Sequence, residues 1–301
     1  MYVLINMKDA RLKVKPIPVP QGFHHPNTPG DILPYHEFSM GVIAPKGSGK
    51  TTMIANLLKF YEGYFHTILI FSPTVASDEK WDWVKKQNLL GENKPLKKWL
   101  KMMAHKKEDE NKVVQHAYPT TELANETDLG RMTDFKIPEE CFYSEYDEDT
   151  LQGIMDEQMR MVKLLKKCGQ SKHLANRVLI VFDDLVGSSL FSNKKENPFK
   201  KLNTNHRHYS ASLVMVTQAY KEIPKTVRTQ FSCLIVFEIA NEKEVEVIFE
   251  ENPNYLKRDE WMELYEYATN GDHDFLFINY QKPKRLRLMR NFDQVVFKSK
   301  E

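Results

Sequence analysis

The chain has 301 residues, 41% hydrophobic and 28% charged, which is typical of a globular protein and excludes disordered and fibrous classes. A formal net charge of +2 is too small to indicate nucleic-acid binding by itself, so such a role needs local basic patches. The longest purely apolar runs, Val178 to Phe182 among them, are far shorter than the roughly 20 residues of a membrane-spanning helix, so we expect no membrane segment.

The first residues and the cysteines both indicate a reducing compartment. The N-terminus has no basic region followed by an apolar stretch and a cleavage site, so we expect that the protein is not secreted. The cysteines, Cys141, Cys168 and Cys233, are odd in number and include no CxxC pair. This pattern argues against a disulfide framework and against a zinc site.

The chain begins with a proline-rich segment. Six of the fifteen prolines lie in the first 34 residues, where neither a helix nor a central strand is sustained. We therefore predict an extended arm over residues 1–35 and one domain over residues 36–301.

The domain opens with alternating strand and helix signals. Phe38 to Ala44 and His66 to Ser72 are short apolar runs typical of buried strands, and Thr51 to Tyr61 between them has apolar residues at helical spacing. A strand, helix, strand unit builds parallel sheets, so this segment predicts an α/β fold.

Residues 79–172 have a different composition and are predicted to be a mainly helical insertion. The segment is charged and contains no strong strand signal. Within it, Pro138 to Gln158 has eight acidic and no basic residues. This stretch leads into an amphipathic helix with an acidic start that ends near Gly169.

The strand signal returns after the insertion. Val178 to Phe182, Leu213 to Val216 and Leu234 to Phe237 are apolar runs bounded by polar residues, as buried parallel strands are. Two helices are predicted next, over residues 242–251 and 259–268, followed by a C-terminal hairpin of residues 274–279 and 285–290. The predicted fold is therefore α/β with a mostly parallel central sheet.

A phosphate-binding motif lies between the first strand and the first helix. The segment Ala44 to Thr51, APKGSGKT, matches GxxxxGK[ST] except at its first position. Its glycines let successive N–H groups point at phosphate oxygens, and the helix N-terminus favours negative charge. Lys50 is expected to reach the β and γ phosphates and Thr51 to bind Mg²⁺. The predicted nucleotide-binding residues are Pro45, Lys46, Gly47, Ser48, Gly49, Lys50, Thr51 and Thr52.

Two aspartates follow the strand at residues 178–182. We expect Asp183 to be the carboxylate partner of Mg²⁺ and Asp184 to orient or deprotonate the attacking water. An Asp pair can also simply end a strand and cap a turn, but its pairing with the phosphate loop favours the catalytic interpretation.

Three further polar residues are candidate catalytic groups. Gln218 ends the next strand, where its side chain can sense the γ-phosphate. Arg228, and as a second choice Arg207, can reach the nucleotide of a neighbouring subunit and stabilise its transition state. For each arginine, an ordinary surface or ion-paired role stays open.

Two basic patches are candidate contacts for DNA phosphates. Residues 188–210 contain Lys194, Lys195, Lys200, Lys201 and Arg207 against the single acid Glu196, and residues 282–290 contain five basic residues and no acid. A solvated charged face is the alternative for both.

The succession of these motifs resembles the FtsK–HerA superfamily of genome-packaging ATPases of large eukaryotic DNA viruses and virophages, of the poxvirus type. The resemblance covers about residues 38–78 and 177–293, in which Asp184 replaces a glutamate common in that superfamily and Ala44 replaces the first glycine. It is carried by APKGSGKTT, HTILIFSPT, LIVFDDL, RHYSASLVMVTQ, IPKTVRTQ and DFLFINYQKPKRLRLMRNFD.

The resemblance implies a RecA-like P-loop ATPase that hydrolyses ATP with Mg²⁺. It also implies a homo-oligomeric ring that translocates double-stranded DNA into a capsid, through phosphate contacts and with a capsid or portal component as partner. The expected location is the virus assembly site in the host cytoplasm, or the virion. Two other interpretations of the residues stay open. One is a P-loop kinase or GTPase, although no NKxD guanine signature is present, and the other is a nucleotide-binding assembly scaffold with negligible turnover.

Overall fold

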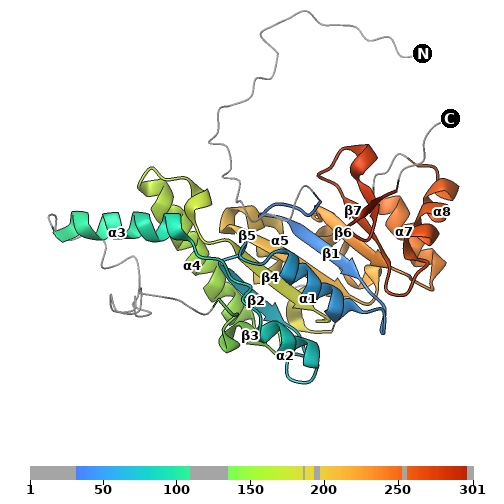
Figure 1. Cartoon of the computed structure of the whole chain (residues 1–301), viewed down its shortest axis with the longest axis horizontal. Helices are drawn as coiled ribbons and strands as arrows, with labels where there is room; N and C mark the ends of the chain where they lie inside the picture. Colours follow the sequence, from blue (N-terminus) through green and yellow to red (C-terminus); the bar gives the residue numbers. More distant parts are fainter. Residues whose placement is uncertain (1–31, 109–134, 186, 193–196, 253–255, 297–301) are drawn as a thin grey trace, which may run out of the picture.

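The computed structural model describes residues 32–108, 135–185, 187–192, 197–252 and 256–296. Their centre is one nine-stranded sheet with the order β3-β2-β4-β5-β1-β6-β7-β8-β9 (Figure 1). The strands are β1 (Ser39–Ile43), β2 (Thr67–Phe71), β3 (Phe142–Tyr143), β4 (Val178–Asp183), β5 (Ala211–Thr217), β6 (Cys233–Phe237), β7 (Phe275–Asn279), β8 (Leu288–Arg290) and β9 (Gln294–Val295).

The sheet is parallel from β3 to β6 and antiparallel from β6 to β9. The predicted α/β fold with a mostly parallel sheet and a C-terminal hairpin is therefore confirmed. The strand β5 separates β1, which leads into the phosphate loop, from β4, which ends in the Asp pair. This strand order is that of a RecA-like sheet.

Helices cover both faces of the sheet, which is why its central strands are apolar throughout. Along β4, Val178, Ile180 and Phe182 belong to one core, whereas Leu179 and Val181 belong to the other. The helices are α1 (Lys50–Phe60), α2 (Glu79–Lys85), α3 (Lys94–Glu108), α4 (Glu148–Lys167), α5 (Pro198–Asn205), α6 (Lys225–Arg228), α7 (Glu242–Glu251) and α8 (Arg258–Thr269).

Each core has its own helices. Helices α1 and α2 pack on one face through Ile54, Leu57 and Trp81, and the other face is covered by α4, α5, α7 and α8. No helix in the described ranges is long and apolar enough to cross a membrane.

The predicted insertion contains α2, α3, α4 and one strand that the sequence did not predict. Strand β3 pairs with β2 at Ile70 and Phe71 and forms the edge of the sheet. It was missed because two residues are too few to produce a periodic signal. The division into an arm, a domain and an insertion stays a prediction, and residues 1–31 of the predicted arm lie outside the described residues.

Candidate nucleotide-binding site

The predicted phosphate loop runs from the end of β1 into α1, at the edge where the parallel strands end. Gly47 and Gly49 have φ values of 85° and 91°, in the left-handed region that glycine adopts without steric cost. Gly49 is the N-cap of α1, and no side chain of the described residues caps this helix. The amides of its first turn are therefore available to an anion, and the helix dipole favours negative charge there.

Hydrogen bonds from three directions hold this loop. The Ser48 hydroxyl donates to the Pro45 carbonyl at 2.8 Å, and the Ala44 amide donates to the Thr217 carbonyl at 2.9 Å. A third bond joins Nδ1 of His273 to the Ser48 carbonyl at 3.0 Å. His273 lies between α8 and β7, 225 residues along the chain from Ser48. Sequence reasoning missed it because nothing local to NGDHDF indicates a contact with the loop.

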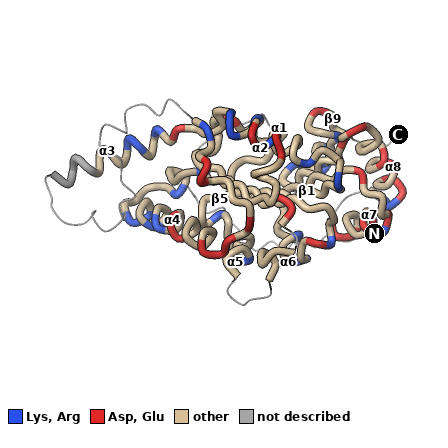
Figure 2. Tube along the Cα trace, turned by 90° about the horizontal axis from the view of Figure 1, so that it is seen from below, with Lys and Arg blue, Asp and Glu red and all other residues tan. Residues whose placement is uncertain are grey.

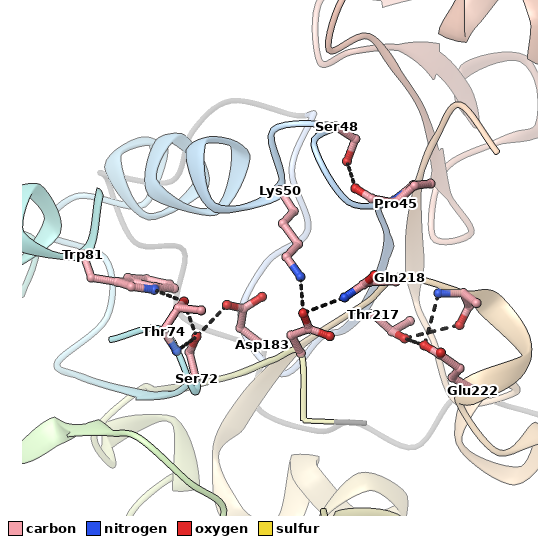
Figure 3. Close-up of polar contacts among 12 residues, drawn as sticks. Pro45, Ser48, Lys50, Ser72, Thr74, Trp81, Asp183, Thr217, Gln218 and Glu222 are labelled. Atoms are coloured by element: carbon pink, nitrogen blue, oxygen red, sulfur yellow. Dashed lines mark hydrogen bonds and ion pairs between the residues drawn. The ribbon is translucent and has the colours of Figure 1, made fainter. Parts of the chain in front are cut away.

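Asp183 is the last residue of β4 and is buried, with 1% of its surface exposed. Its Oδ2 accepts a hydrogen bond from the Ser72 hydroxyl at 2.7 Å (Figure 3). Its other oxygen, Oδ1, has no hydrogen-bond partner among the described residues. Burial raises the pKa of this carboxyl, although the Ser72 hydrogen bond and the Lys50 charge act in the opposite direction. Ser72 was not predicted as a site residue; its position after β2, the neighbour of β4, is the signal that was available.

The surroundings of Asp183 fit a hard divalent cation. A buried carboxylate oxygen without a partner is costly unless a cation or a proton compensates it. The nearly buried Thr51 provides a hydroxyl at the start of α1. Mg²⁺ is bound by one or two protein oxygens together with substrate phosphates and water. In the part of the chain that the structure describes, no group of three or more His, Cys, Asp or Glu side chains is placed to hold a metal.

Asp184 is turned away from the core. Its φ of 52° is in the left-handed region, which Asp tolerates better than most residues. Its Oδ2 accepts from Lys50 Nζ at 2.5 Å and from Gln218 Nε2 at 2.8 Å. Figure 3 shows Lys50 and Gln218 pointing to the same carboxylate, beside Asp183. The structure therefore brings together Lys50, Asp183, Asp184 and Gln218, which were predicted from three separate segments.

The turn after Gln218 is fixed by Glu222, which the sequence analysis did not select. Its Oε2 accepts from the Thr217 hydroxyl at 2.5 Å and from the Ala219 amide at 3.2 Å. These hydrogen bonds brace the backbone on both sides of Gln218. The Gln218 side chain is itself exposed to solvent.

A cavity of about 790 Å³ adjoins the phosphate loop. One wall is the loop and the first turns of α1, and the other comes from the C-terminal hairpin and β6. Its lining includes the aromatic residues Phe60, Phe237, Phe275 and Phe292, together with His273, Asn291 and Asp293. An aromatic cavity next to an anion-binding loop has the chemistry that a nucleotide requires, with stacking for the base and amides for the phosphates.

Arg228 does not reach this site in the chain. Its guanidinium makes a bidentate ion pair with Glu251, at 2.8 Å from Nε and 2.6 Å from the NH2 nitrogen, and also donates to the Ile223 carbonyl at 2.6 Å. It lies over the Tyr220 ring at 4.6 Å, and its side chain is only 9% exposed. These intramolecular contacts occupy the guanidinium within the chain. Action of Arg228 on a neighbouring subunit therefore requires the Glu251 ion pair to open, and that role stays a prediction.

Arg207 is exposed and precedes β5. The phosphate loop lies at the opposite end of the parallel strands, since Ser39 pairs with Leu213 at one end and Ile43 with Thr217 at the other. Arg207 is therefore remote from the site of its own chain.

The two predicted basic patches are only partly described. Lys194 and Lys195 lie outside the described residues, whereas Lys200 and Lys201 lie on α5. The second patch forms the turn after β7 and the strand β8. There Arg290 pairs with Asp274, while Lys284 and Arg285 are exposed.

Residues 134–264 match the model of a family described as poxvirus A32 protein. The matched segment is 131 of the 301 residues. It contains the Asp pair, Gln218 and both arginines but not the phosphate loop. The match confirms the resemblance to poxvirus-type packaging ATPases that the motifs indicated. No curated protein sequence matches the chain.

Solved structures that align with most of this chain include a viral packaging NTPase and two further proteins. One is the genome packaging NTPase B204 from Sulfolobus turreted icosahedral virus 2 in complex with AMP, with 13% identity, a TM-score of 0.45 and coverage of 81% of this chain and 93% of that one. The pCW3 conjugation coupling protein TcpA has 13% identity and a TM-score of 0.42, with coverage of 80% and 57%. Thermomonospora curvata EccC (ATPases 2 and 3) has 9% identity and a TM-score of 0.36, with coverage of 87% and 37%.

Proposed function

We propose that this chain, whose residues 134–264 match the poxvirus A32 family, is an ATPase that translocates double-stranded DNA and packages a viral genome. The observation that carries the proposal is the convergence of Lys50 and Gln218 on the Asp184 carboxylate, beside the buried Asp183 and the open amides of α1. A general acid–base residue, a cation for phosphate and a buried carboxylate are the groups that phosphoryl transfer to water requires.

The residues of the chain have separable tasks. The amides of residues 47–52 and the Lys50 ammonium neutralise the triphosphate, and the aromatic cavity receives the base. Phosphate oxygens compete with Asp184 for Lys50, so we expect nucleotide binding to open that ion pair and free the carboxylate. Thr51 and Asp183 would hold Mg²⁺, which would supply neutralisation of the phosphate charge.

In the proposed hydrolysis step, Asp184 acts as the general base. The carboxylate accepts a proton from water as the water oxygen bonds to the γ-phosphorus, and the bond to the bridging oxygen breaks to leave ADP and phosphate. Gln218, whose flanking residues are held by Glu222, donates to the Asp184 carboxylate, so its side chain is expected to respond when phosphate and water occupy the site. It is placed to report the loss of that phosphate to the turn after β5.

The assembly that we propose is a homo-oligomeric ring that acts with a capsid or portal component at the virus assembly site in the host cytoplasm, or in the virion. Arg228 and Arg207 both stay candidates for action on a neighbouring subunit, and the exposed Arg207 is the one that we favour. Its distance from the site of its own chain is compatible with that role, because a residue acting in trans need not lie near its own nucleotide.

Release of phosphate from ATP, with and without duplex DNA, tests the proposal. We expect turnover that duplex DNA stimulates and that Asp184→Asn suppresses. Turnover that requires a small phosphoryl acceptor would instead indicate a kinase, and preference for GTP would indicate a GTPase. Binding of ATP without turnover under either condition would indicate an assembly scaffold and contradict the proposal.

A further inference from the structure

The basic surface that stands out most in the structure lies mainly on the predicted insertion, in residues that the sequence analysis did not select. It adjoins the first predicted patch, because Lys172 Nζ donates to the Arg207 carbonyl at 3.0 Å. Helix α3 packs on the C-terminal half of α4 through a small separate core of Leu96, Leu165 and Ala175, with Trp99 and Val162 against it. We call residues 93–103 and 158–177, which surround this core, the distal lobe. Figure 1 shows α3 at the end of the molecule opposite to β7 and α8.

The distal lobe carries a high net positive charge. Its residues include ten lysines and arginines and no aspartate or glutamate. The chain as a whole has a net charge of +2, so the lobe contributes +10 and everything else contributes −8. Figure 2 shows this separation as blue segments along α3 and at one end of α4, with red segments elsewhere on α4.

Most of these cations are available to a ligand. Three of the ten are engaged: Lys97 pairs with Glu92, Lys172 pairs with Glu37, and Arg177 lies over the Tyr64 ring. The other seven are exposed and form no ion pair with any described residue. They are Lys94, Lys98, Lys101, Arg160, Lys163, Lys166 and Lys167.

Helix stability explains only a small part of this pattern. Cations in the last turn of a helix interact favourably with its dipole, and this accounts for Lys166 and Lys167 at the end of α4. It does not account for Arg160 and Lys163 in earlier turns, nor for the lysines at the start of α3, where the dipole disfavours positive charge. Clustered cations repel one another and retain counterions, so such a surface gains free energy when a polyanion replaces those ions.

The spacing and residue types favour a duplex over an acidic protein surface. Lys94 to Lys101 and Arg160 to Lys167 each extend over about 10 Å of helix, which matches about three phosphates along one DNA strand. Six of the seven exposed cations are lysines, which act as point charges rather than as bidentate readers of base edges. A surface of this kind binds the backbone without regard to sequence.

We propose that the distal lobe of α3 and α4 binds the phosphate backbone of duplex DNA without sequence preference. This inference rests on the proposed DNA translocase and adds a contact surface outside the nucleotide site. It places the insertion against DNA while the hydrolysis residues remain at the edge of the sheet.

The test compares two variants of the full chain with the same change in charge. In the lobe variant, Lys98, Lys101, Lys163 and Lys167 are replaced by Ala; in the control variant, Lys221, Lys225, Lys243 and Lys257, which are exposed near α6, α7 and α8, are replaced by Ala. Alanine favours helix, so the lobe is expected to keep its fold, as thermal unfolding checks. A Lys→Gln version of the lobe variant keeps the same charge change if the Ala version unfolds.

The measurement is the affinity for two fluorescent duplexes of unrelated sequence over a range of salt concentrations. We expect the lobe variant to bind both duplexes at least about tenfold more weakly at low salt. Its log–log salt slope should be smaller by about 0.9 for each phosphate that the lobe no longer neutralises. The control variant is expected to retain the wild-type slope, and ATP turnover without DNA is expected to be the same in all three proteins.

The outcomes separate this inference from the proposed function. Equal slopes for the lobe and control variants, with the wild type binding DNA, would overturn the lobe contact alone. Loss of self-association with an unchanged slope would assign the lobe to an acidic protein surface and would likewise overturn it. A wild-type protein that binds no duplex at any salt concentration would contradict the proposed function itself.

Discussion

Asp183 and Asp184 are adjacent in sequence but have opposite surroundings, because β4 ends between them. Asp183 keeps the strand conformation, is buried and accepts from Ser72. Asp184 adopts a positive φ and turns toward Lys50 and Gln218. The Asp183 carboxylate is therefore suited to bind a cation, and the Asp184 carboxylate is suited to accept a proton.

The buried Asp183 carboxylate is expected to lower the stability of the folded protein, and a bound cation is expected to offset that cost. Because burial raises the pKa of Asp183, the folded protein holds this proton to a higher pH than the unfolded chain does. The free energy of unfolding therefore falls as pH rises from the ordinary pKa of an aspartate to the raised value. At neutral pH, Asp183→Asn should raise the melting temperature of the nucleotide-free protein.

The same substitution should remove the thermal stabilisation that MgATP gives beyond that of ATP with a chelator. Scanning calorimetry at neutral pH, with and without MgATP, measures both effects. A variant with a lower melting temperature and an undiminished response to Mg²⁺ would show that Asp183 is a structural residue.

At this scale the sequence predicted the residues of the site better than their supports. Lys50, Asp183, Asp184 and Gln218 could be identified from the sequence, because each directly follows an apolar strand or belongs to a known motif. Ser72, Glu222 and His273 were not, because their roles depend on contacts across strands and turns. The ion pair of Arg228 could not be predicted either, because its partner Glu251 lies 23 residues away on another helix.

Among the elements, the phosphate loop depends on a backbone conformation that a substitution can test. Gly49→Ala places a side chain at a φ of 91° and a Cβ 3.1 Å from His273. The strain is about 1–2 kcal/mol, and we expect weaker ATP binding together with a lower melting temperature.

Gly153 provides the matched control for this substitution. It lies inside α4 at an exposed position where an added Cβ meets no described atom within 4 Å. Gly153→Ala should stabilise the protein by about 0.5–1 kcal/mol, because alanine is the better helix residue. Equal effects of the two substitutions in thermal unfolding and ATP titration would contradict the predicted role of the loop conformation.

The C-terminal hairpin forms the aromatic wall of the cavity, and Phe292 tests its role in binding the base. Its ring contacts Phe60 and Phe275, with centroids 5.9 and 5.0 Å away. Phe292→Ala should weaken ATP binding about tenfold, since base–aromatic stacking is worth about 1–3 kcal/mol. Binding of inorganic tripolyphosphate, which has no base, should be unchanged.

Lys50→Ala is the reference for that comparison, because it should weaken both ligands. Isothermal titration of the two variants with both ligands separates the effects. Equal loss of ATP and tripolyphosphate binding in Phe292→Ala would mean that the ring only supports the fold of the loop.

Elements with strong periodicity were predicted well and short ones were not. The bounds of α7 were predicted to the residue, and the parallel strands β1, β2, β4, β5 and β6 were placed within one or two residues. Strand β8 is shorter than predicted because a 3₁₀ turn at Lys284–Leu286 occupies the start of the predicted strand. The cavity was not predictable, since it forms only when the hairpin packs beside α1.

For the whole molecule, the ring hypothesis predicts complementation between inactive variants. Arg207→Ala protein mixed with Asp184→Asn protein should regain ATP turnover, because some interfaces pair an intact Arg207 with an intact Asp184. Each variant alone should be inactive in phosphate release. Turnover of Arg207→Ala protein equal to that of the wild type would remove this arginine from the site.

Arg228→Ala is the contrasting variant. It leaves Glu251 without its partner in a largely buried environment, so we expect a lower melting temperature rather than complementation. Complementation by Arg228→Ala, with an unchanged melting temperature, would instead assign the action on the neighbouring subunit to Arg228.

The central claim is that ATP hydrolysis drives this chain along duplex DNA. Displacement of a third-strand oligonucleotide from a duplex tests it most directly, because a motor moving along the duplex removes the third strand without separating the other two. We predict displacement by the wild type with ATP, and none with a non-hydrolysable analogue or with Asp184→Asn. Hydrolysis of ATP stimulated by the duplex without displacement of the third strand would contradict the account.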